Sequence, residues 1–182
     1  YGNFGSVFRE YAGVQLTEPL QVGVTYYLSF RVCKAEGKPL QPVYWACNNT
    51  GLLFTMQSNV WNGTSGPPFP PRNHAHLKAE EIMEDTAQWV LVSGEFIADS
   101  AYQYMAIGNF YDDLHTDTLN YGLPNASGVY SFVDEVCVSS SPNGYETGNS
   151  IMEVAASGML RVFPNPAVQW VYLRDFFSAN GL

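Results

Sequence analysis

Hydrophobic and polar residues alternate over short stretches of this chain, and the alternation predicts β-strands. In the segment 25–33, Leu28, Phe30 and Val32 fall on one face, whereas Ser29 and Arg31 fall on the other. Further stretches that predict strands occupy residues 10–16, 43–46, 51–57, 88–97, 102–110 and 129–139. One segment, 76–84, favours a short acidic helix instead.

Turn-forming residues separate these segments and indicate the domain organisation. Glycine and proline crowd residues 62–72, which predicts a long loop, and a Ser/Gly/Pro/Asn-rich stretch predicts a linker over 140–158. Six or seven short strands with little helix predict an antiparallel β-sandwich, such as a jelly roll, over residues 1–139. A partial second β domain is expected in residues 159–182.

A complete jelly roll takes about eight strands, more than the pattern predicts here. The chain also opens in loop-like sequence. We therefore expect a missing strand, which either upstream sequence or a neighbouring subunit supplies. An unpaired edge favours self-association by strand addition, with the apolar segment 160–177 of another copy as a candidate donor.

The same pattern predicts a core in which Trp89 and Phe96 are buried against Leu28, Phe30 and Val32. Three cysteines are too few for a disulfide scaffold and too scattered for a zinc site. If a disulfide forms, the expected pair is Cys33 with Cys47.

Charge removes several classes of partner. The chain has 182 residues, with 8 Lys and Arg against 17 Asp and Glu, and its formal net charge is −9. Such a chain has no electrostatic footprint for nucleic acid or anionic membranes. No stretch approaches the ~20 apolar residues of a membrane span.

Catalytic patterns are weak. The three histidines lie in loop-like sequence, and no Gly-x-Ser-x-Gly motif is present. The pair His74 and His76 lacks a third metal ligand nearby, and the carboxylates of residues 80–85 fall on a solvated face. We therefore expect no enzymatic activity.

Two groups of residues are candidates for binding. Asp134 and Glu135 interrupt an apolar strand, so they must meet a cation, backbone N–H groups or solvent, and their hard oxygens favour Ca²⁺. Trp45, Trp61 and Tyr111 are candidates for stacking on sugar rings, whose C–H groups offer an apolar surface. Packing in the protein is the alternative for each aromatic side chain.

An ordered set of motifs over residues 5–139 resembles the jelly-roll domains of type IX secreted proteins, which are related to carbohydrate-binding and galactose-binding-like modules. The motifs are Arg9-Glu10-Tyr11, Tyr27-Leu28-Ser29-Phe30, Asn48-Asn49-x-Gly51, Asp85-Thr86-x-x-Trp89, Gly94-x-Phe96-x-Ala98, Ile107-Gly108-Asn109-Phe110 and Phe132-Val133-Asp134-Glu135-Val136. In related modules an Asp of the last motif belongs to a structural Ca²⁺ site, although Glu135 replaces the usual second Asp.

A second resemblance concerns the C-terminal segment. Residues 159–167, with Pro164, Asn165 and Pro166 at their centre, are similar to the opening of the type A sorting domain of type IX secretion. The resemblance implies export by the type IX machinery to the outside of a Gram-negative bacterium. Three Asp-Ser/Thr-apolar tripeptides further match the O-glycosylation pattern of such bacteria, at Thr86, Ser100 and Thr118.

These observations leave three functions open. The first is a non-catalytic adhesive or glycan-binding module on the cell surface. The second is a structural subunit of an extracellular filament or surface layer. The third is an accessory domain of a larger secreted enzyme.

Overall fold

The structure is a computed structural model of the chain, and it describes residues 9–38, 41–58, 72–122, 128–142 and 161–162. Within these ranges, all regular secondary structure is β-strand. The strands are β1 (Ala12–Gln15), β2 (Thr25–Lys34), β3 (Gly37–Lys38), β4 (Gln41–Pro42), β5 (Trp45–Cys47), β6 (Thr50–Thr55), β7 (Leu77–Lys78), β8 (Val90–Ile97), β9 (Tyr104–Asn109), β10 (Thr118–Asn120), β11 (Ser131–Ser139) and β12 (Arg161–Val162). The predicted all-β class is confirmed.

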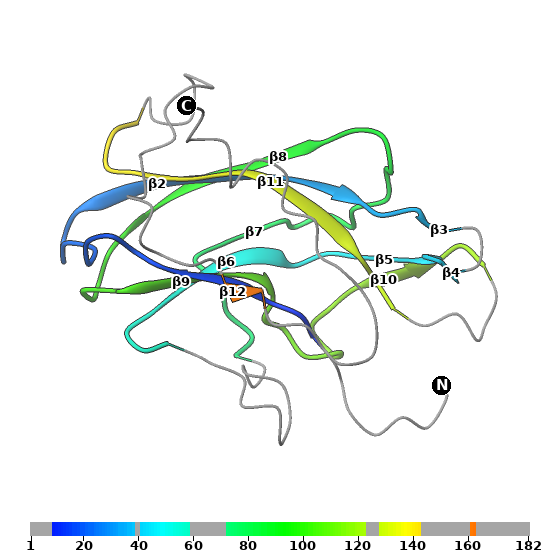
Figure 1. Cartoon of the computed structure of the whole chain (residues 1–182), viewed down its shortest axis with the longest axis horizontal. Helices are drawn as coiled ribbons and strands as arrows, with labels where there is room; N and C mark the ends of the chain where they lie inside the picture. The colour runs from blue at the N-terminus through cyan, green and yellow to red at the C-terminus, as the bar shows by residue number, and fades with distance from the viewer. Residues whose placement is uncertain (1–8, 39–40, 59–71, 123–127, 143–160, 163–182) are drawn as a thin grey trace, which may run out of the picture.

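Two antiparallel sheets contain most of the described strand residues. One has the strand order β12-β1-β9-β6-β7 and the other β11-β2-β8. Figure 1 shows them as two layers, with β11, β2 and β8 above β1, β9 and β6. Two smaller pairs, β10 with β5 and β3 with β4, complete the described strands.

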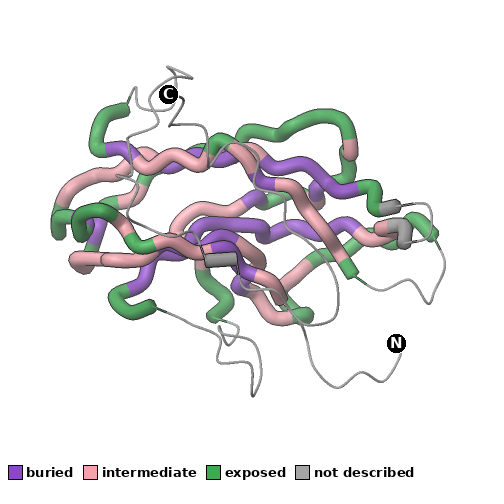
Figure 2. The backbone as a smooth tube through the Cα atoms, in the orientation of Figure 1, coloured by how far each residue is buried: buried purple, intermediate pink, exposed green. Residues whose placement is uncertain are grey.

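The main core lies between the two sheets, where buried segments of both layers face each other (Figure 2). The predicted burial of Leu28, Phe30 and Val32 is confirmed, since each is fully buried. They pack in one cluster with Leu52 and Phe54 of β6. The strand β2 is the middle strand of its sheet and has one face against the core. A strand buried on one face is expected to alternate between apolar and polar residues, as β2 does.

The prediction for Trp89 was wrong. Phe96 packs against the core and stacks on Phe54 with ring centroids 5.1 Å apart, but Trp89 is 38% exposed. Successive side chains of a strand point to opposite faces, so two residues seven positions apart cannot share one. Trp89 directly precedes β8 and is exposed, as are Leu91 and Ile97.

A second, smaller core anchors the chain that follows β9. Tyr11, Leu53, Ala106 and Phe110 form it, separate from the cluster between the sheets. The rings of Tyr11 and Phe110 stack with centroids 5.0 Å apart. Since Leu53 belongs to this cluster and Leu52 to the main one, β6 is buried on both faces, more than its sequence predicted.

The helix predicted over 76–84 does not form. Residues 77–78 pair with β6 as strand β7, and the backbone N–H of Ala79 donates to the carbonyl of Thr50. The N–H of Met83 donates to Cys47 O. The segment therefore bonds to neighbouring strands rather than to its own preceding turn.

The three cysteines are free thiols, so the Cys33–Cys47 pair does not form. Burial raises the pKa of all three thiols. In the β11–β2 ladder Cys33 lies opposite Phe132, and Cys137 lies opposite Ser29. This register also separates Cys33 from Cys137 along the ladder.

The sheet edges bear on the prediction of a missing strand. Among the described residues, β11 and β8 form the two edges of their sheet. The edge of β1 is covered by β12, which pairs Val162 with Ala12 and Arg161 with Gly13 of the same chain. Part of the segment expected to reach another copy therefore pairs within its own chain.

Candidate functional site

The chain from Phe110 to Asp117 forms a loop that is fastened at both ends. At its far end Asn48 and Asp117 bond reciprocally, since the Asn48 Nδ2 donates to Asp117 Oδ2 at 3.0 Å and the Asp117 N donates to Asn48 Oδ1 at 2.9 Å. At its near end Asn109 Oδ1 accepts from the N–H of Tyr111 at 2.9 Å. These contacts attach the loop to β9 and to the β5–β6 turn.

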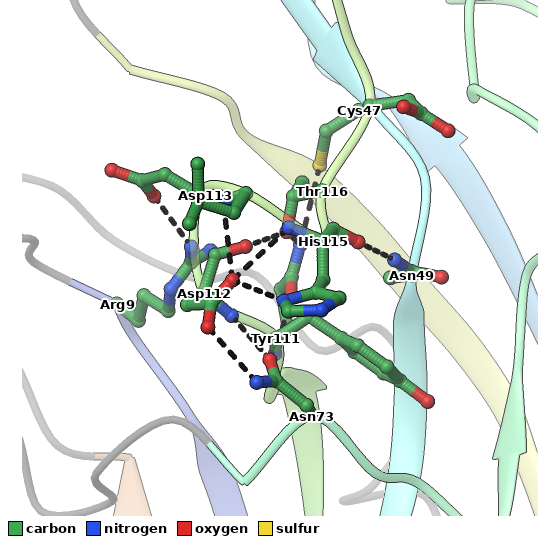
Figure 3. Close-up of polar contacts among 12 residues, drawn as sticks. Arg9, Cys47, Asn49, Asn73, Tyr111, Asp112, Asp113, His115 and Thr116 are labelled. Atoms are coloured by element: carbon green, nitrogen blue, oxygen red, sulfur yellow. Dashed lines mark hydrogen bonds and ion pairs between the residues drawn. The ribbon is translucent and has the colours of Figure 1, made fainter.

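Asp112 is the centre of the loop (Figure 3). Its Oδ1 accepts from the backbone N–H groups of Leu114 and His115, and lies 2.6 Å from His115 Nδ1. Its Oδ2 accepts from Asn73 Nδ2 at 2.9 Å, and its own N–H donates to Asn73 Oδ1. The hydrogen bonds from Asn73 and His115 lower the pKa of Asp112 to about 2, so the carboxylate is ionised and His115 Nδ1 is the donor.

Two left-handed residues let the chain reach these partners. Asn49 has φ of 65° and Asn73 has φ of 51°, a conformation that asparagine tolerates better than most residues. Asn49 Nδ2 donates to His115 O at 2.7 Å. The asparagines therefore both shape the turns and supply the hydrogen bonds.

A charged and aromatic group lies beside the loop. The Lys78 ammonium is 5.1 Å from the centre of the Tyr111 ring, and it donates to Asn49 Oδ1 at 2.8 Å and to Glu80 at 2.7 Å. A cation at this distance over an aromatic face is attracted by the ring quadrupole. We call Lys78, Glu80, Tyr111 and His115 the Tyr111 surface, because Lys78 contacts Glu80 and Tyr111, and Asn49 links Lys78 to the backbone carbonyl of His115.

The loop also has an outer part that makes few contacts. Leu114 is 94% exposed. Asp113 points its carboxylate at Arg9, with Nη2 and Oδ1 2.7 Å apart, and its side chain is mostly exposed. In Figure 3 the Tyr111 side chain extends away from this Arg9–Asp113 pair.

The predicted His74–His76 pair is a packing feature. The His76 ring packs edge-on against Phe54, Phe96 and Tyr102, and its Nδ1 accepts from the N–H of Phe54 at 3.1 Å. Burial, with a smaller effect of His74, lowers the pKa of His76 to about 4. Within the described ranges no three His, Cys, Asp or Glu side chains are grouped so as to hold a metal ion.

The predicted aromatic residues have separate locations. Tyr111 belongs to the surface defined above, whereas Trp45 begins β5, opposite Asn120 of β10, and is partly buried. Trp61 lies outside the described residues. The structure therefore joins Tyr111, but not the other two, to a polar constellation.

Asp134 and Glu135 lie at a β-bulge of β11, where the register against β2 shifts between Asp134 and Cys137. Glu135 has φ of 48° and forms an ion pair with Arg31, and Asp134 Oδ1 accepts from the Glu135 N–H. Of the three expected environments, the pair has all of them, since it meets the Arg31 guanidinium and a backbone N–H, and the Glu135 side chain is mostly exposed to solvent. These two carboxylates alone do not complete the six to eight oxygen ligands that Ca²⁺ takes.

The three candidate glycosylation residues lie in the described part of the chain, whereas the sorting motif does not. Thr86 is partly buried and donates to Glu36 at 3.0 Å, Ser100 is partly buried, and Thr118 is exposed on β10. Pro164, Asn165 and Pro166 lie outside the described residues.

Sequence reasoning missed the residues that fix the loop, namely Asn48, Asn49, Asn73, Asn109 and Lys78. Three of these asparagines fall within the motifs Asn48-Asn49-x-Gly51 and Ile107-Gly108-Asn109-Phe110. The paired glycines are the available signal, because Gly51 and Gly108 lie opposite each other in β6 and β9. A side chain on either would meet a neighbour within 2.5 Å.

Comparison of the chain with protein-family models, curated proteins and solved structures gives no match. Among the described residues no helix is long and apolar enough to cross a membrane.

Proposed function

We propose that the chain is a non-catalytic, secreted surface module of jelly-roll type that binds glycans through the Tyr111 surface. The observation that carries the proposal is the partly exposed Tyr111 ring with Lys78 5.1 Å from its centre, on a loop whose backbone is held by hydrogen bonds. A fixed loop loses little conformational freedom when a ligand binds.

The groups around the ring suit a sugar. Hydroxyl groups need both donors and acceptors, and Lys78 donates whereas Glu80, whose side chain is mostly exposed, accepts. His115 presents its second ring nitrogen once Nδ1 is bonded to Asp112. The aromatic face offers the apolar surface against which sugar C–H groups stack.

The experiment is glycan-array screening of the chain, followed by calorimetric titration with the best ligand. We expect Tyr111→Ala to weaken binding about tenfold, which corresponds to about 1.4 kcal/mol. Tyr104→Ala is the matched control, because Tyr104 begins β9 and Tyr111 follows its opposite end. Absence of glycan binding, or equal binding by both variants, would contradict the proposal.

Export by the type IX machinery is the second part of the proposal, and it rests on the Pro164-Asn165-Pro166 motif after the Ser/Gly-rich linker. In a bacterium with this machinery, replacing the three residues by alanine is expected to leave the protein inside the outer membrane. Undiminished appearance on the cell surface would argue against a sorting role.

A structural Ca²⁺ at Asp134 and Glu135 belongs to the proposal provided that residues beyond the described ranges supply further oxygens. Thermal unfolding with added Ca²⁺ or with a chelator tests it. A raised melting temperature that Asp134→Asn abolishes is expected, and identical melting under both conditions would remove the ion from the proposal.

An accessory role beside an enzyme is compatible with the same binding surface. A structural role in a filament or surface layer would need a further contact between copies besides the open edge of β8, because an edge that pairs with itself closes at two copies.

A further inference from the structure

The outer edge of β8 is open. The strand has eight residues and ends its sheet, and no strand in the described part of the chain pairs with its free side. Unpaired N–H and C=O groups along a long edge are a template for another strand.

The ladder with β2 shows which backbone groups face outward. The N–H of Ala98 donates to Val24 O, and the register continues without interruption from Thr25–Ile97 to Val32–Val90. Because hydrogen bonding alternates along an antiparallel strand, the even-numbered residues of β8 bond to β2. The odd-numbered residues 91–97 therefore direct their N–H and C=O groups toward the open side.

The side chains at this edge are apolar. Four of the large exposed hydrophobic residues of the described chain lie here, and they are Trp89, Val90, Leu91 and Ile97. Residues 88–98 contain no Lys, Arg or Pro, and Glu95 is their one charge. The residues by which proteins commonly block an edge strand are thus almost absent.

We propose that β8 pairs antiparallel with β8 of a second copy of this chain, about a two-fold axis at Ser93. Ser93 then lies opposite Ser93 of the second copy, and Leu91 opposite Glu95. Trp89 lies opposite Ile97 twice, once on each side of the axis.

Charge and packing select this register. Directly opposed residues share one face of a sheet, so the axis passes through a residue. With the axis at Gly94 the two Glu95 positions would be only two residues apart along the strands, about 7 Å. The Ser93 axis separates them by four residues, about 13 Å, which exceeds the Debye length of about 8 Å at physiological salt. An axis at Val92 would place Ile97 opposite the small side chain of Ala87 rather than opposite Trp89.

The resulting sheet is continuous across both copies, in the order β11-β2-β8-β8-β2-β11. Because the same surface is used on both sides, the assembly closes at two copies. In each cross-strand pair, Trp89 of one copy packs against Ile97 of the other. Both side chains are exposed in the single chain.

Sedimentation velocity of the full chain tests the interface. Over an about hundredfold range of concentration, the mass is expected to rise from that of one 20.2 kDa chain toward twice that value. Ser93→Pro removes an outward N–H without touching the β2 ladder, and Ile97→Lys places a charge in the apolar pair, so each variant is expected to stay monomeric. Leu114→Lys is the matched control, an exposed apolar residue away from β8, and is expected to dimerise like the wild type.

A cross-link tests the register. Opposed residues in a hydrogen-bonded pair have Cα atoms about 5.5 Å apart, within the span of a disulfide. Ser93→Cys is expected to form a covalent dimer on mild oxidation, whereas Glu95→Cys and the wild type are not. A monomer at every concentration, dimerisation unchanged in both Ser93→Pro and Ile97→Lys, or cross-linking of Glu95→Cys as efficient as that of Ser93→Cys would overturn the proposal.

Discussion

Hydrogen bonds between asparagines and charged residues hold the candidate site in shape. Asn48 and Asn73 each exchange two hydrogen bonds with one aspartate, and Asn49 joins the loop to Lys78. An amide side chain both donates and accepts, so it can satisfy a backbone group and a carboxylate at once.

The pKa of Asp112 gives a prediction for acid conditions. Its folded-state pKa of about 2 lies below the ordinary value of 3.8, so the stabilisation is present above about pH 4 and is lost as the pH falls through 2. Asp112→Asn is expected to be less stable than the wild type at neutral pH and to match it near pH 2. Denaturant unfolding across this range measures the difference, with Asp113→Asn as the control of smaller effect. A constant gap between wild type and Asp112→Asn at all pH values would refute the assignment.

The pKa of His76 gives a second prediction, for mildly acidic pH. Here the folded state disfavours the charged form of the side chain, whereas at Asp112 it favours the charged form. Its pKa of about 4 lies below the ordinary value of 6.5 because burial disfavours the charged ring. The folded protein is therefore expected to lose stability as the pH falls from 6.5 to 4. The loss should be about 2 kcal/mol, since solvent reaching the partly exposed ring screens some of the full cost.

The matched variant is His76→Asn, whose side-chain oxygen replaces the Nδ1 acceptor of the Phe54 N–H. Its stability should depend much less on pH in that window than the stability of the wild type. Equal slopes in His76→Asn and the wild type would show that another group titrates.

At the scale of elements, the sequence predicted the long strands and the short strand β5, and missed the other short ones. All seven predicted stretches overlap a strand, because alternation over several residues can be recognised locally. The strands β3, β4, β7, β10 and β12 have two or three residues each, which is too short for a period to show. The supposed helix over 76–84 failed for the related reason that its few apolar residues pack against neighbouring strands.

The close approach of β6 and β7 gives a testable prediction. A Cβ atom on Gly51 would lie 2.4 Å from the carbonyl oxygen of Leu77, a backbone atom that no rotamer change can move. Gly51→Ala is expected to cost about 1–3 kcal/mol of unfolding free energy and to displace Lys78 from Tyr111. Gly13→Ala, whose Cβ would have 3.4 Å to its nearest neighbour, is the control. Denaturant unfolding of both variants measures the difference, and equal stability would show that β7 yields without penalty.

At the scale of the whole molecule, the sandwich is predicted to be separable from the rest of the chain. Its strands β1 to β11 lie between residues 12 and 139, and of the strands in the described residues only β12 comes from beyond residue 142. A chain ending at residue 142 is expected to keep the β-type circular dichroism spectrum and to lose about 1–2 kcal/mol through the two lost residue pairs. Loss of cooperative melting would mean that residues 143–182 are part of the folding unit.

The fold class was accessible from sequence because it depends on local patterns, whereas the site was not. The Tyr111 surface joins β7, the β5–β6 turn and the loop after β9, which are distant in sequence. Only Tyr111 was singled out in advance, since an aromatic side chain is a recognised binding group and an asparagine is not. These segments come together because β9, β6 and β7 are neighbours in the folded sheet.

The 110–117 loop is held at both ends, and this affects which of its positions can vary in evolution. The contacts of Asp112 and Asp117 set the path of the backbone, and Leu114, at the tip, takes almost no part in it. A substitution at position 114 therefore alters what the loop presents while leaving folding intact. The residues that hold the loop backbone are thus separate from the side chain at its tip, so the exposed surface of the loop can diversify by single mutations.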